Sequence, residues 1–319
     1  MRVLVTGIDG FVGSHAAEFL LARPGVEVHG TVVDASNLPN IEHVRGKLHL
    51  HTLNILDRDR VTHLLSEIKP DRVIHLAGQA FVPAAFSDPV STFQVNILGG
   101  IHLLDGTRSL AEKGTQRATL LIVSTGEVYG KVARLPITEE CPIAPNNPYA
   151  ASKAAIDIVA RQYHESFGLR VIVARPFNHV GPRQSPVFVC ANFARQIARI
   201  AAGQQEKTIH VGNLQAQRDF TDVRDVVRAY WMLLEHSQGG VCNVCSGSPV
   251  AVGDILHSLI KIAGTDVNVV SESGRLRPYD VPVVYGSNEK LQALTGWKPA
   301  IPLEQTLRDV YEYWRHASS

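Results

Sequence analysis

Two side chains, four residues apart, have the types and spacing for acid–base chemistry on a hydroxyl or a carbonyl group. Tyr149 and Lys153 stand in the segment YAASK, which follows Pro148 and begins a helical pattern. A spacing of four puts both side chains on one helix face, so the ammonium group can lie beside the phenol. Because a neighbouring cation favours the phenolate, we expect Lys153 to lower the pKa of Tyr149 from its ordinary value of ~10. An amphipathic helix with an incidental Tyr and Lys would show the same spacing.

A glycine-rich loop near the start of the chain has the pattern of a dinucleotide site. In TGIDGFVGSH, Gly7, Gly10 and Gly13 follow an apolar strand pattern directly and open a helical one. Glycine lets the backbone approach a pyrophosphate, and the helix start at Phe11 and Val12 offers free N–H groups to it. Glycines also cluster in ordinary turns, but the flanking strand and helix favour dinucleotide binding here.

The residues after the second strand bear on the choice of cofactor. An acidic residue there binds the ribose hydroxyls and favours NAD, whereas an arginine favours the 2′-phosphate of NADP. The sequence has Val32, Val33 and Asp34 and no arginine at this place. Asp34 favours NAD(H), but it lies slightly late and can equally begin the loop, so we expect either NADP(H) or NAD(H).

These residues must be positioned by a parallel sheet wrapped by helices. The first half of the chain alternates β-branched runs with longer helical patterns, which is typical of a doubly wound, Rossmann-type α/β fold. We expect strands at 2–7, 26–33, 47–55, 72–78, 119–125 and 170–177, with helices near 11–22, 57–67, 89–109 and 148–167. In such folds ligands lie beyond the carboxyl ends of the strands.

After Phe177 the pattern changes, which predicts a second, smaller α/β domain that binds substrate. We expect helices near 189–202, 252–263 and from Leu303, and a helix capped by Thr221 or Asp222 that leads into the strand VCNVCSG. The predicted cofactor domain comprises 1–174 and about 219–245, and the predicted substrate domain about 175–218 and 246–319.

Composition excludes several other classes of protein. The 31 basic and 30 acidic residues leave a net charge of +1, so we expect no nucleic acid partner. The four cysteines, of which Cys242 and Cys245 form a CxxC, are too few for a disulfide framework and read as buried thiols, with no metal site. No segment approaches the ~20 apolar residues of a membrane span. We therefore expect a soluble, cytoplasmic protein.

The glycine loop, the strand ending in Ser124 and Thr125, and the later YxxxK resemble the extended short-chain dehydrogenase/reductase family over essentially the whole chain. The resemblance implies that Thr125 hydrogen bonds the sugar O4, that Tyr149 exchanges a proton with it, and that Lys153 holds the nicotinamide ribose. It also implies cofactor contacts near Asn54 and Ile55, which follow the third strand. Further contacts are implied at Leu76, Ala77 and Gly78, which end the fourth strand, and at Asn96 in the following helix. Each of these could equally be a structural group.

The same resemblance implies a site for a sugar nucleotide. Asn178 follows the sixth strand where family members place an Asn against the substrate diphosphate, and Arg218 and Arg277 stand in motifs whose arginines clamp it. We expect both arginines in loops. Asp280 departs from the glutamate with which guanosine-nucleotide members tend to contact the nucleotide ribose, but its shorter side chain is compatible with that role. The family resemblance implies a GDP-sugar as the substrate.

Within the family, RPFNHVGPRQS, VGNLQAQRDFTDVRD and TGWKPAIPLEQTL resemble the GDP-6-deoxy-4-keto-mannose reductases, which form GDP-D-rhamnose, and next the GDP-mannose 4,6-dehydratases. The dehydratases have a glutamate at the position of Glu127, and it serves as their base. They carry an Asp or Ser at the position where this chain has Gly126. We therefore expect reduction of a C4 ketone, with dehydration or 4-epimerisation as alternatives and a non-enzymatic redox sensor as a further one. The resemblance also implies a homodimer, or a dimer of dimers, through the helices at 89–109 and 148–167.

Overall fold

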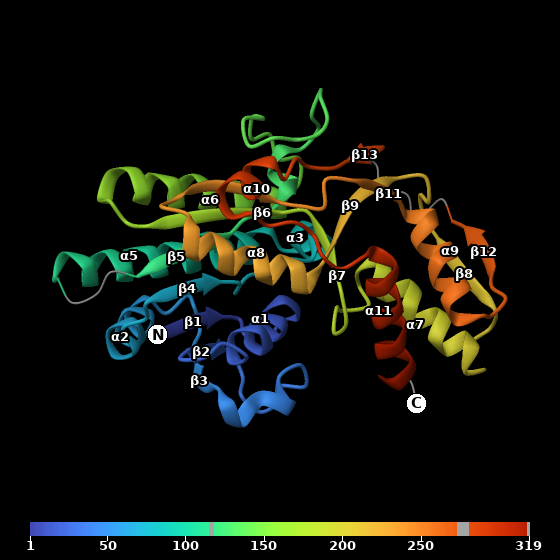
Figure 1. The fold of residues 1–319 in the computed structure, drawn as a ribbon, viewed down its shortest axis with the longest axis horizontal. Coiled ribbons are helices and arrows are strands. Elements are labelled where there is room, and N and C mark those ends of the chain that lie inside the picture. The colour runs from blue at the N-terminus through green and yellow to red at the C-terminus, as the bar shows by residue number, and fades with distance from the viewer. Residues whose placement is uncertain (115–117, 273–280, 318–319) are drawn as a thin grey trace.

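A parallel β-sheet forms the centre of the larger lobe of the protein, as seen in a computed structural model that describes residues 1–114, 118–272 and 281–317 (Figure 1). In these residues seven strands lie side by side in the order β10-β6-β5-β4-β1-β2-β3, and every neighbouring pair is parallel. Their bounds are β1 Arg2–Thr6, β2 Glu27–Val32, β3 His49–Thr52, β4 Arg72–His75, β5 Thr119–Val123, β6 Val171–Pro176 and β10 Gly240–Val244. The doubly wound fold predicted from the apolar runs is confirmed.

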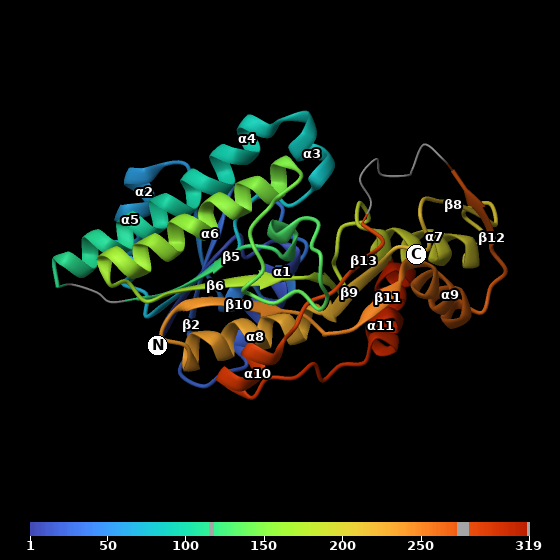
Figure 2. The same cartoon turned by 90° about the horizontal axis from the view of Figure 1, so that it is seen from above.

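Helices cover both faces of this sheet (Figure 2). The helices α2 (Arg58–Ile68), α5 (Gly99–Glu112) and α6 (Pro148–Phe167) lie on one face, and α1 (Phe11–Leu21), α8 (Val223–His236) and α10 (Glu289–Thr295) lie on the other. Successive strand side chains point to opposite faces, so Val3 and Val5 pack in the cluster that includes α1 and α8, and Leu4 packs in the one that includes α2 and α5. The sheet is thus buried on both sides.

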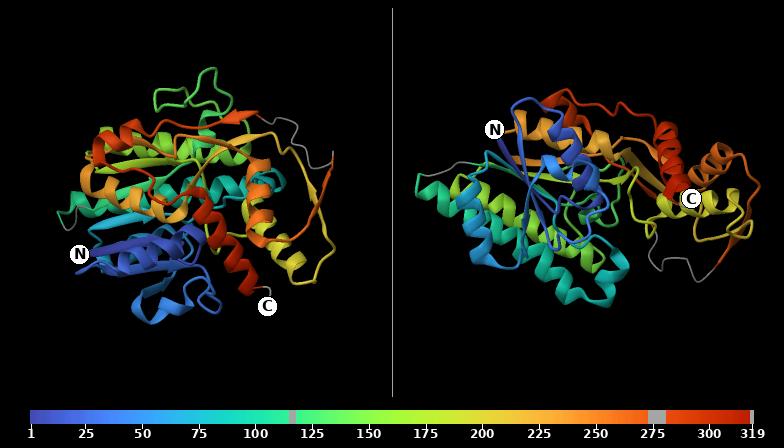
Figure 3. Two further views of the ribbon diagram at one scale, coloured as in Figure 1. Left: turned by 45° about the vertical axis from the view of Figure 1, so that its right-hand side comes forward. Right: turned by 90° about the horizontal axis from the view of Figure 1, so that it is seen from below.

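The smaller lobe lies beside one end of the sheet (Figures 1 and 3). Its helices α7 (Val189–Ala201), α9 (Val252–Ala263) and α11 (Leu303–Ala317) share one apolar cluster with the strand β8 (Thr208–Val211), which pairs with β12 (Asn268–Ser271). A short sheet centred on β9 (Gln217–Asp222) connects the lobes, with β7 (Asn178–Val180), β11 (Pro249–Ala251) and β13 (Val283–Val284) as its partners.

Three sequence expectations differ from the structure in detail. The helix expected at 89–109 is α4 (Pro89–Phe93), a π-helical turn η2 (Gln94–Leu98) and α5, and it follows the short α3 (Val82–Ser87). Arg218 lies in strand β9 and not in a loop. Residues 42–47 form a 3₁₀ turn, η1, that was not expected. Of the two candidate caps of α8, the Asp222 side chain is the one that accepts from the Arg224 N–H.

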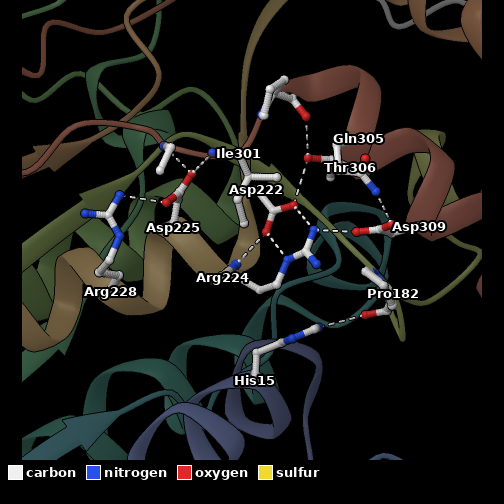
Figure 4. Close-up of polar contacts among 12 residues, drawn as sticks. His15, Pro182, Asp222, Arg224, Asp225, Arg228, Ile301, Gln305, Thr306 and Asp309 are labelled. Carbon is white, nitrogen blue, oxygen red and sulfur yellow. Dashed lines mark hydrogen bonds and ion pairs between the residues drawn. The ribbon is translucent and has the colours of Figure 1, made fainter.

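A polar cluster at the start of α8 joins the two lobes (Figure 4). Thr306 of α11 donates to Asp222 at 2.7 Å, and Arg224 bonds both Asp222 and Asp309, also at 2.7 Å. From the other side, the His15 ring of α1 hydrogen bonds the Pro182 carbonyl oxygen at 2.9 Å. These hydrogen bonds therefore connect the helices α1 and α8 of the larger lobe to Pro182 and to α11 of the smaller lobe.

The cysteines and α10 complete the description of the core. Cys242 and Cys245 are fully buried free thiols, as expected, and their burial raises the pKa of each. Leu291 of α10 and the nearby Trp297 pack with the α1 and α8 side of the larger lobe. Among the described residues, no helix has the length and apolar character that crossing a bilayer would need.

Candidate active site

The glycine loop between β1 and α1 is shaped for a closely approaching ligand. Gly7 has φ of 67°, which non-glycine residues rarely adopt, and a Cβ there would lie 3.0 Å from the backbone nitrogen of Ala77. A Cβ on Gly13 would overlap the Gly7 carbonyl oxygen, so only glycine lets α1 begin this close to β1. Gly10 is the N-cap of α1 and has no side chain to cap it, so the backbone N–H groups of Phe11 and Val12, in the first turn, have no acceptor within the helix.

The end of β4 closes the same site from the neighbouring strand. The Thr6 hydroxyl accepts from the backbone N–H groups of Leu76 and Ala77 at 3.2 and 3.1 Å, which fixes β4 against β1. A Cβ on Gly78 would lie 2.8 Å from the Asn96 side-chain oxygen and 3.5 Å from the Lys153 ammonium nitrogen. The predicted cofactor residues that directly follow β1 and β4 thus lie close to Asn96 of η2 and to Lys153.

Asn96 is fully buried and holds this edge of the site in place. Its side-chain oxygen accepts from the Gln79 N–H at 2.8 Å, and its amide donates to the Gln79 carbonyl and to Ser152 of α6. Asn96 stands in the π-helical turn η2, a distortion that often occurs at functional sites. Its contacts tie the end of β4 to the helix that carries Tyr149.

Tyr149 and Thr125 meet at the carboxyl end of β5. Both residues are more than nine-tenths buried, and the Thr125 hydroxyl lies close enough to Tyr149 to act on its pKa. Burial, together with the negative charge of Glu127, raises the pKa of Tyr149, and the hydrogen bond with Thr125 opposes this only in part. Our expectation that Lys153 lowers the pKa of Tyr149 is therefore wrong for this structure, because desolvation dominates and the lysine points elsewhere.

Lys153 lies one helical turn after Tyr149 and is buried beside it. Its ammonium group donates to the Val123 carbonyl oxygen at 2.9 Å, at the end of β5. Burial lowers the pKa of Lys153 from 10.5 to about 8. The group therefore remains mostly charged at pH 7, where it faces Gly78 and the cofactor side of the site.

Glu127 is exposed and is held by a residue that the sequence reasoning missed. The Asn147 amide donates to the Glu127 carboxylate at 2.9 Å, while the Asn147 side-chain oxygen caps α6 by accepting from the Ala150 N–H at 2.8 Å. An asparagine directly before Pro148, at the start of a helix, is a recognisable N-cap signal. Asn147 thus connects the loop that carries Thr125 to the helix that carries Tyr149.

Gly126 is enclosed by an aromatic ring. A Cβ on Gly126 would lie 2.9 Å from the Phe177 ring, which is itself buried between Gly126 and Gly286. A side chain at position 126 would therefore require Phe177 to move. The packing of Phe177 therefore favours glycine next to Thr125, at the position where the family resemblance puts an Asp or Ser in dehydratases.

The remaining predicted cofactor residues follow the strands β2 and β3. Asp34 is exposed, and its two carboxylate oxygens accept from the N–H and the hydroxyl of Ser36, each at 2.8 Å. These hydrogen bonds lower the pKa of Asp34. Asn54 accepts from the Leu56 N–H at 3.0 Å, and Ile55 is buried against Gly99.

The predicted substrate residues lie on the short sheet between the lobes. Asn178 of β7 donates to the Asp219 carbonyl oxygen at 3.3 Å, and the neighbouring Arg218 donates to the Gln217 carbonyl oxygen at 2.8 Å. Arg277 and Asp280 lie outside the described residues. Asn178 and Arg218 thus lie on the two paired strands β7 and β9 of this sheet.

The fold and the Thr125, Tyr149 and Lys153 set define an oxidoreductase of the short-chain dehydrogenase/reductase class. Residues 4–310 match the family model for GDP-mannose 4,6 dehydratase, and the chain belongs to this family. It is 41% identical over 316 residues to GDP-6-deoxy-D-mannose reductase of Pseudomonas aeruginosa, covering 98% of this chain and 97% of that one. It is 31% identical to GDP-mannose 4,6-dehydratase of Vibrio cholerae, covering 99% and 95%. The solved structure of RMD from P. aeruginosa, complexed with NADPH, superposes with a TM-score of 0.85 at 39% identity over 99% of both chains.

Proposed function

We propose that this chain reduces the C4 ketone of a GDP-4-keto-6-deoxy-hexose, forming GDP-D-rhamnose from GDP-4-keto-6-deoxy-D-mannose. Thr125 and Tyr149 hydrogen bond the ketone oxygen, and the Tyr149 hydroxyl gives it a proton as C4 is reduced. A nicotinamide cofactor, when bound, supplies the hydride. The 41% identity to a GDP-6-deoxy-D-mannose reductase over nearly the whole chain supports this substrate.

The observation that carries the proposal is the 41% identity to GDP-6-deoxy-D-mannose reductase over nearly the whole chain, and Tyr149 supplies the proton donor that reduction needs. Burial and Glu127 raise its pKa above the ordinary ~10, so the phenol keeps its proton at neutral pH. Ketone reduction needs a proton donor at the oxygen, whereas alcohol oxidation begins with removal of a proton from a hydroxyl. A neutral, buried Tyr149 therefore suits reduction.

The second candidate is a 4,6-dehydratase, and Glu127 favours it. Its exposed carboxylate lies beside the Tyr149 and Thr125 pair and has the chemistry of a base for a carbon-bound proton. Dehydration also needs an acid for the departing hydroxyl, and Gly126, closed in by Phe177, provides none. We therefore rank reduction first.

We propose NADPH as the cofactor. Gly7 and Gly10 with the start of α1 would hold its diphosphate, and Lys153 its nicotinamide ribose. Asp34, the residue that would favour NADH, has both carboxylate oxygens bonded to Ser36 in a turn. The P. aeruginosa relative whose structure contains NADPH gives independent support.

We further propose that residues 1–174 and about 219–245 bind the cofactor, and that about 175–218 and 246–319 bind the sugar nucleotide through Asn178, Arg218, Arg277 and Asp280. A homodimer formed along the helical segment of α4, η2 and α5 and along α6 is part of the proposal, supported by the exposed apolar Leu98 of η2 and Ile158 of α6. Four free thiols, all within the described residues, support a cytoplasmic location.

Product analysis tests this function. The enzyme is given GDP-mannose or its 4-keto-6-deoxy derivative, each with NADPH and with NADH, and the sugar nucleotides are identified by NMR spectroscopy. We expect GDP-D-rhamnose from the keto sugar with NADPH, and a large loss of this activity in Tyr149→Phe, on the order of the ~10²–10⁴-fold typical of acid–base groups. A keto sugar formed from GDP-mannose, with no reduction of the keto sugar, would instead establish the dehydratase.

A further inference from the structure

A buried ion pair, which the proposed chemistry does not use, lies directly behind the catalytic residues. Asp157 stands on α6 one turn beyond Lys153, so Tyr149, Lys153 and Asp157 form a single stripe along the helix. The Asp157 side chain is fully buried, and Arg175 of β6 is 2% exposed. Arg175 donates to both carboxylate oxygens of Asp157, at 2.7 and 3.0 Å.

The ion pair continues into the loop that carries Thr125. The remaining arm of the Arg175 guanidinium donates to the Tyr129 hydroxyl at 2.8 Å, and this hydroxyl donates to the Asn243 side-chain oxygen at 2.7 Å. Asn243 in turn donates to the Ile137 carbonyl oxygen at 3.0 Å. Tyr129 is fully buried and ends the 3₁₀ turn η3 (Gly126–Tyr129), for which Thr125 is the N-cap.

Every group in this chain of hydrogen bonds has a fixed role. Burial disfavours the charged form of Arg175, but Asp157 and Tyr129 more than offset this, and the pKa of Arg175 is raised. Burial raises the pKa of Tyr129 as well, so its hydroxyl is neutral and can both accept from Arg175 and donate to Asn243. A partly satisfied buried network is costly, so the loss of one member loosens the others.

We propose that Arg175 is a positioning residue that fixes Tyr129, and with it the 125–130 loop, to Asp157 on α6 and so sets the distance between Thr125 and Tyr149. The proposal rests on the proposed function, because Thr125 and Tyr149 must act on one oxygen atom. Asn147 bridges Glu127 to the start of α6, so the loop is connected to the helix through Glu127 as well as through Tyr129. Misplacement of a reacting group by about 1 Å can cost ~10²-fold in rate.

Two variants test this role. Tyr129→Phe keeps the buried ring and removes only the hydroxyl, and Arg175→Lys keeps a cation that can reach Asp157 or Tyr129 but lacks the fork to hold both. For each we expect a fall in kcat of about 10- to 100-fold with KM for NADPH unchanged. Tyr311→Phe, a buried tyrosine in the apolar cluster of the smaller lobe, is the matched control and should keep the parent kcat.

A double-mutant cycle separates positioning from a general loss of stability. If Tyr129 acts through Thr125, the drop in kcat caused by Tyr129→Phe largely disappears in a Thr125→Val background, because there is no hydroxyl left to misplace. A drop of the same factor in both backgrounds, or a kcat within twofold of the parent in both single variants, would overturn the proposal.

Hydrogen exchange gives a readout that needs no substrate. We expect faster exchange of the amides of residues 126–130 in Tyr129→Phe than in the parent or in Tyr311→Phe, because the loop has lost its anchor. Unchanged exchange there contradicts the positioning role. Parent enzyme that fails to reduce the keto sugar, with faster loop exchange in the variant, would instead contradict the proposed function alone.

Discussion

At the scale of single residues, burial determines the protonation states on which the chemistry depends. Burial lowers the pKa of the Lys153 ammonium group to about 8. Burial also raises the pKa of Tyr149. At pH 7 the Tyr149 phenol is therefore protonated and the Lys153 ammonium group remains mostly charged. That combination suits a site that donates a proton to a ketone and holds a ribose hydroxyl.

The lysine predicts a pH dependence. Lys153 loses its proton above pH about 8 in the folded chain, whereas an unfolded lysine keeps it to about 10.5. The charged form is therefore disfavoured by folding, so the contribution of Lys153 to stability rises between these two pH values. We proposed that the Lys153 ammonium group holds the nicotinamide ribose, and on that proposal we expect kcat/KM for NADPH to fall by about tenfold per pH unit above pH 8.

Steady-state kinetics from pH 6 to 10 measure this limb, and Lys153→Arg is the control. A guanidinium stays charged across the range, so the variant should lose the limb even if its rate is lower throughout. The same limb in Lys153→Arg would show that another group titrates.

Residue types and spacing predicted the positions of the reactive groups but not their environments. The spacing of Tyr149 and Lys153 places them on one helix face from local geometry alone. The rise in the Tyr149 pKa comes first from burial and then from Glu127, which the Asn147 amide holds from 20 residues away in the chain. Contacts of that kind arise only when the loop and the helix pack together.

At the scale of elements, the close approach of α1 to β1 governs the cofactor loop. A Cβ on Gly13 would overlap the Gly7 carbonyl oxygen and lie 2.7 Å from the Ile8 Cα. These are backbone atoms with little freedom to yield, so Gly13→Ala must displace the start of α1. We expect a loss of about 1–3 kcal/mol in the free energy of unfolding, and weaker binding of NADPH by roughly ten- to a hundredfold, which corresponds to the same energies.

Thermal unfolding and fluorescence titration with NADPH measure the two effects. Gly46→Ala is the matched control, because a Cβ there would meet no atom within 4 Å among the described residues. Gly46→Ala should therefore leave Tm and Kd as in the parent. Parent-like values in Gly13→Ala would mean that α1 can shift without disturbing the loop.

The long elements could be predicted from sequence, and the short ones could not. The central strands β1, β5 and β6 are largely apolar runs because helices cover both faces, and this pattern is visible in the chain. The strands β7, β11 and β13 have only two or three residues, and pairing with β9 is what makes them strands. The π-helical turn that holds Asn96 likewise has no local sequence pattern that predicts it.

At the scale of the whole molecule, a buried carboxylate joins segments that are distant in sequence. Asp219 of β9 has no exposed side-chain surface, and its oxygens accept from Ser246, Gly247 and Gly286. Burial raises its pKa, and these hydrogen bonds counteract the shift only in part. The contacts hold β9, which carries Arg218, against the chain that follows β10 and the chain that follows β13. This arrangement was not visible in the sequence, because its partners are brought together only by the folding of both lobes.

This arrangement predicts that Asp219→Asn impairs substrate binding more than catalysis. An amide has one acceptor oxygen, so its NH₂ group would face N–H donors of the surrounding chain, each of which costs about 1–3 kcal/mol when left without an acceptor. Displacement of β9 moves Arg218 directly, whereas Thr125 follows β5 and Tyr149 and Lys153 lie on α6, so we expect these three side chains to move less. We expect KM for the GDP-sugar to rise by about tenfold or more, with kcat changed less and Tm lowered.

Asp254→Asn, an exposed change on α9 of the same lobe, should leave KM and Tm unaltered. A lower Tm with an unchanged KM in Asp219→Asn would assign Asp219 to stability alone and separate the position of β9 from recognition of the substrate.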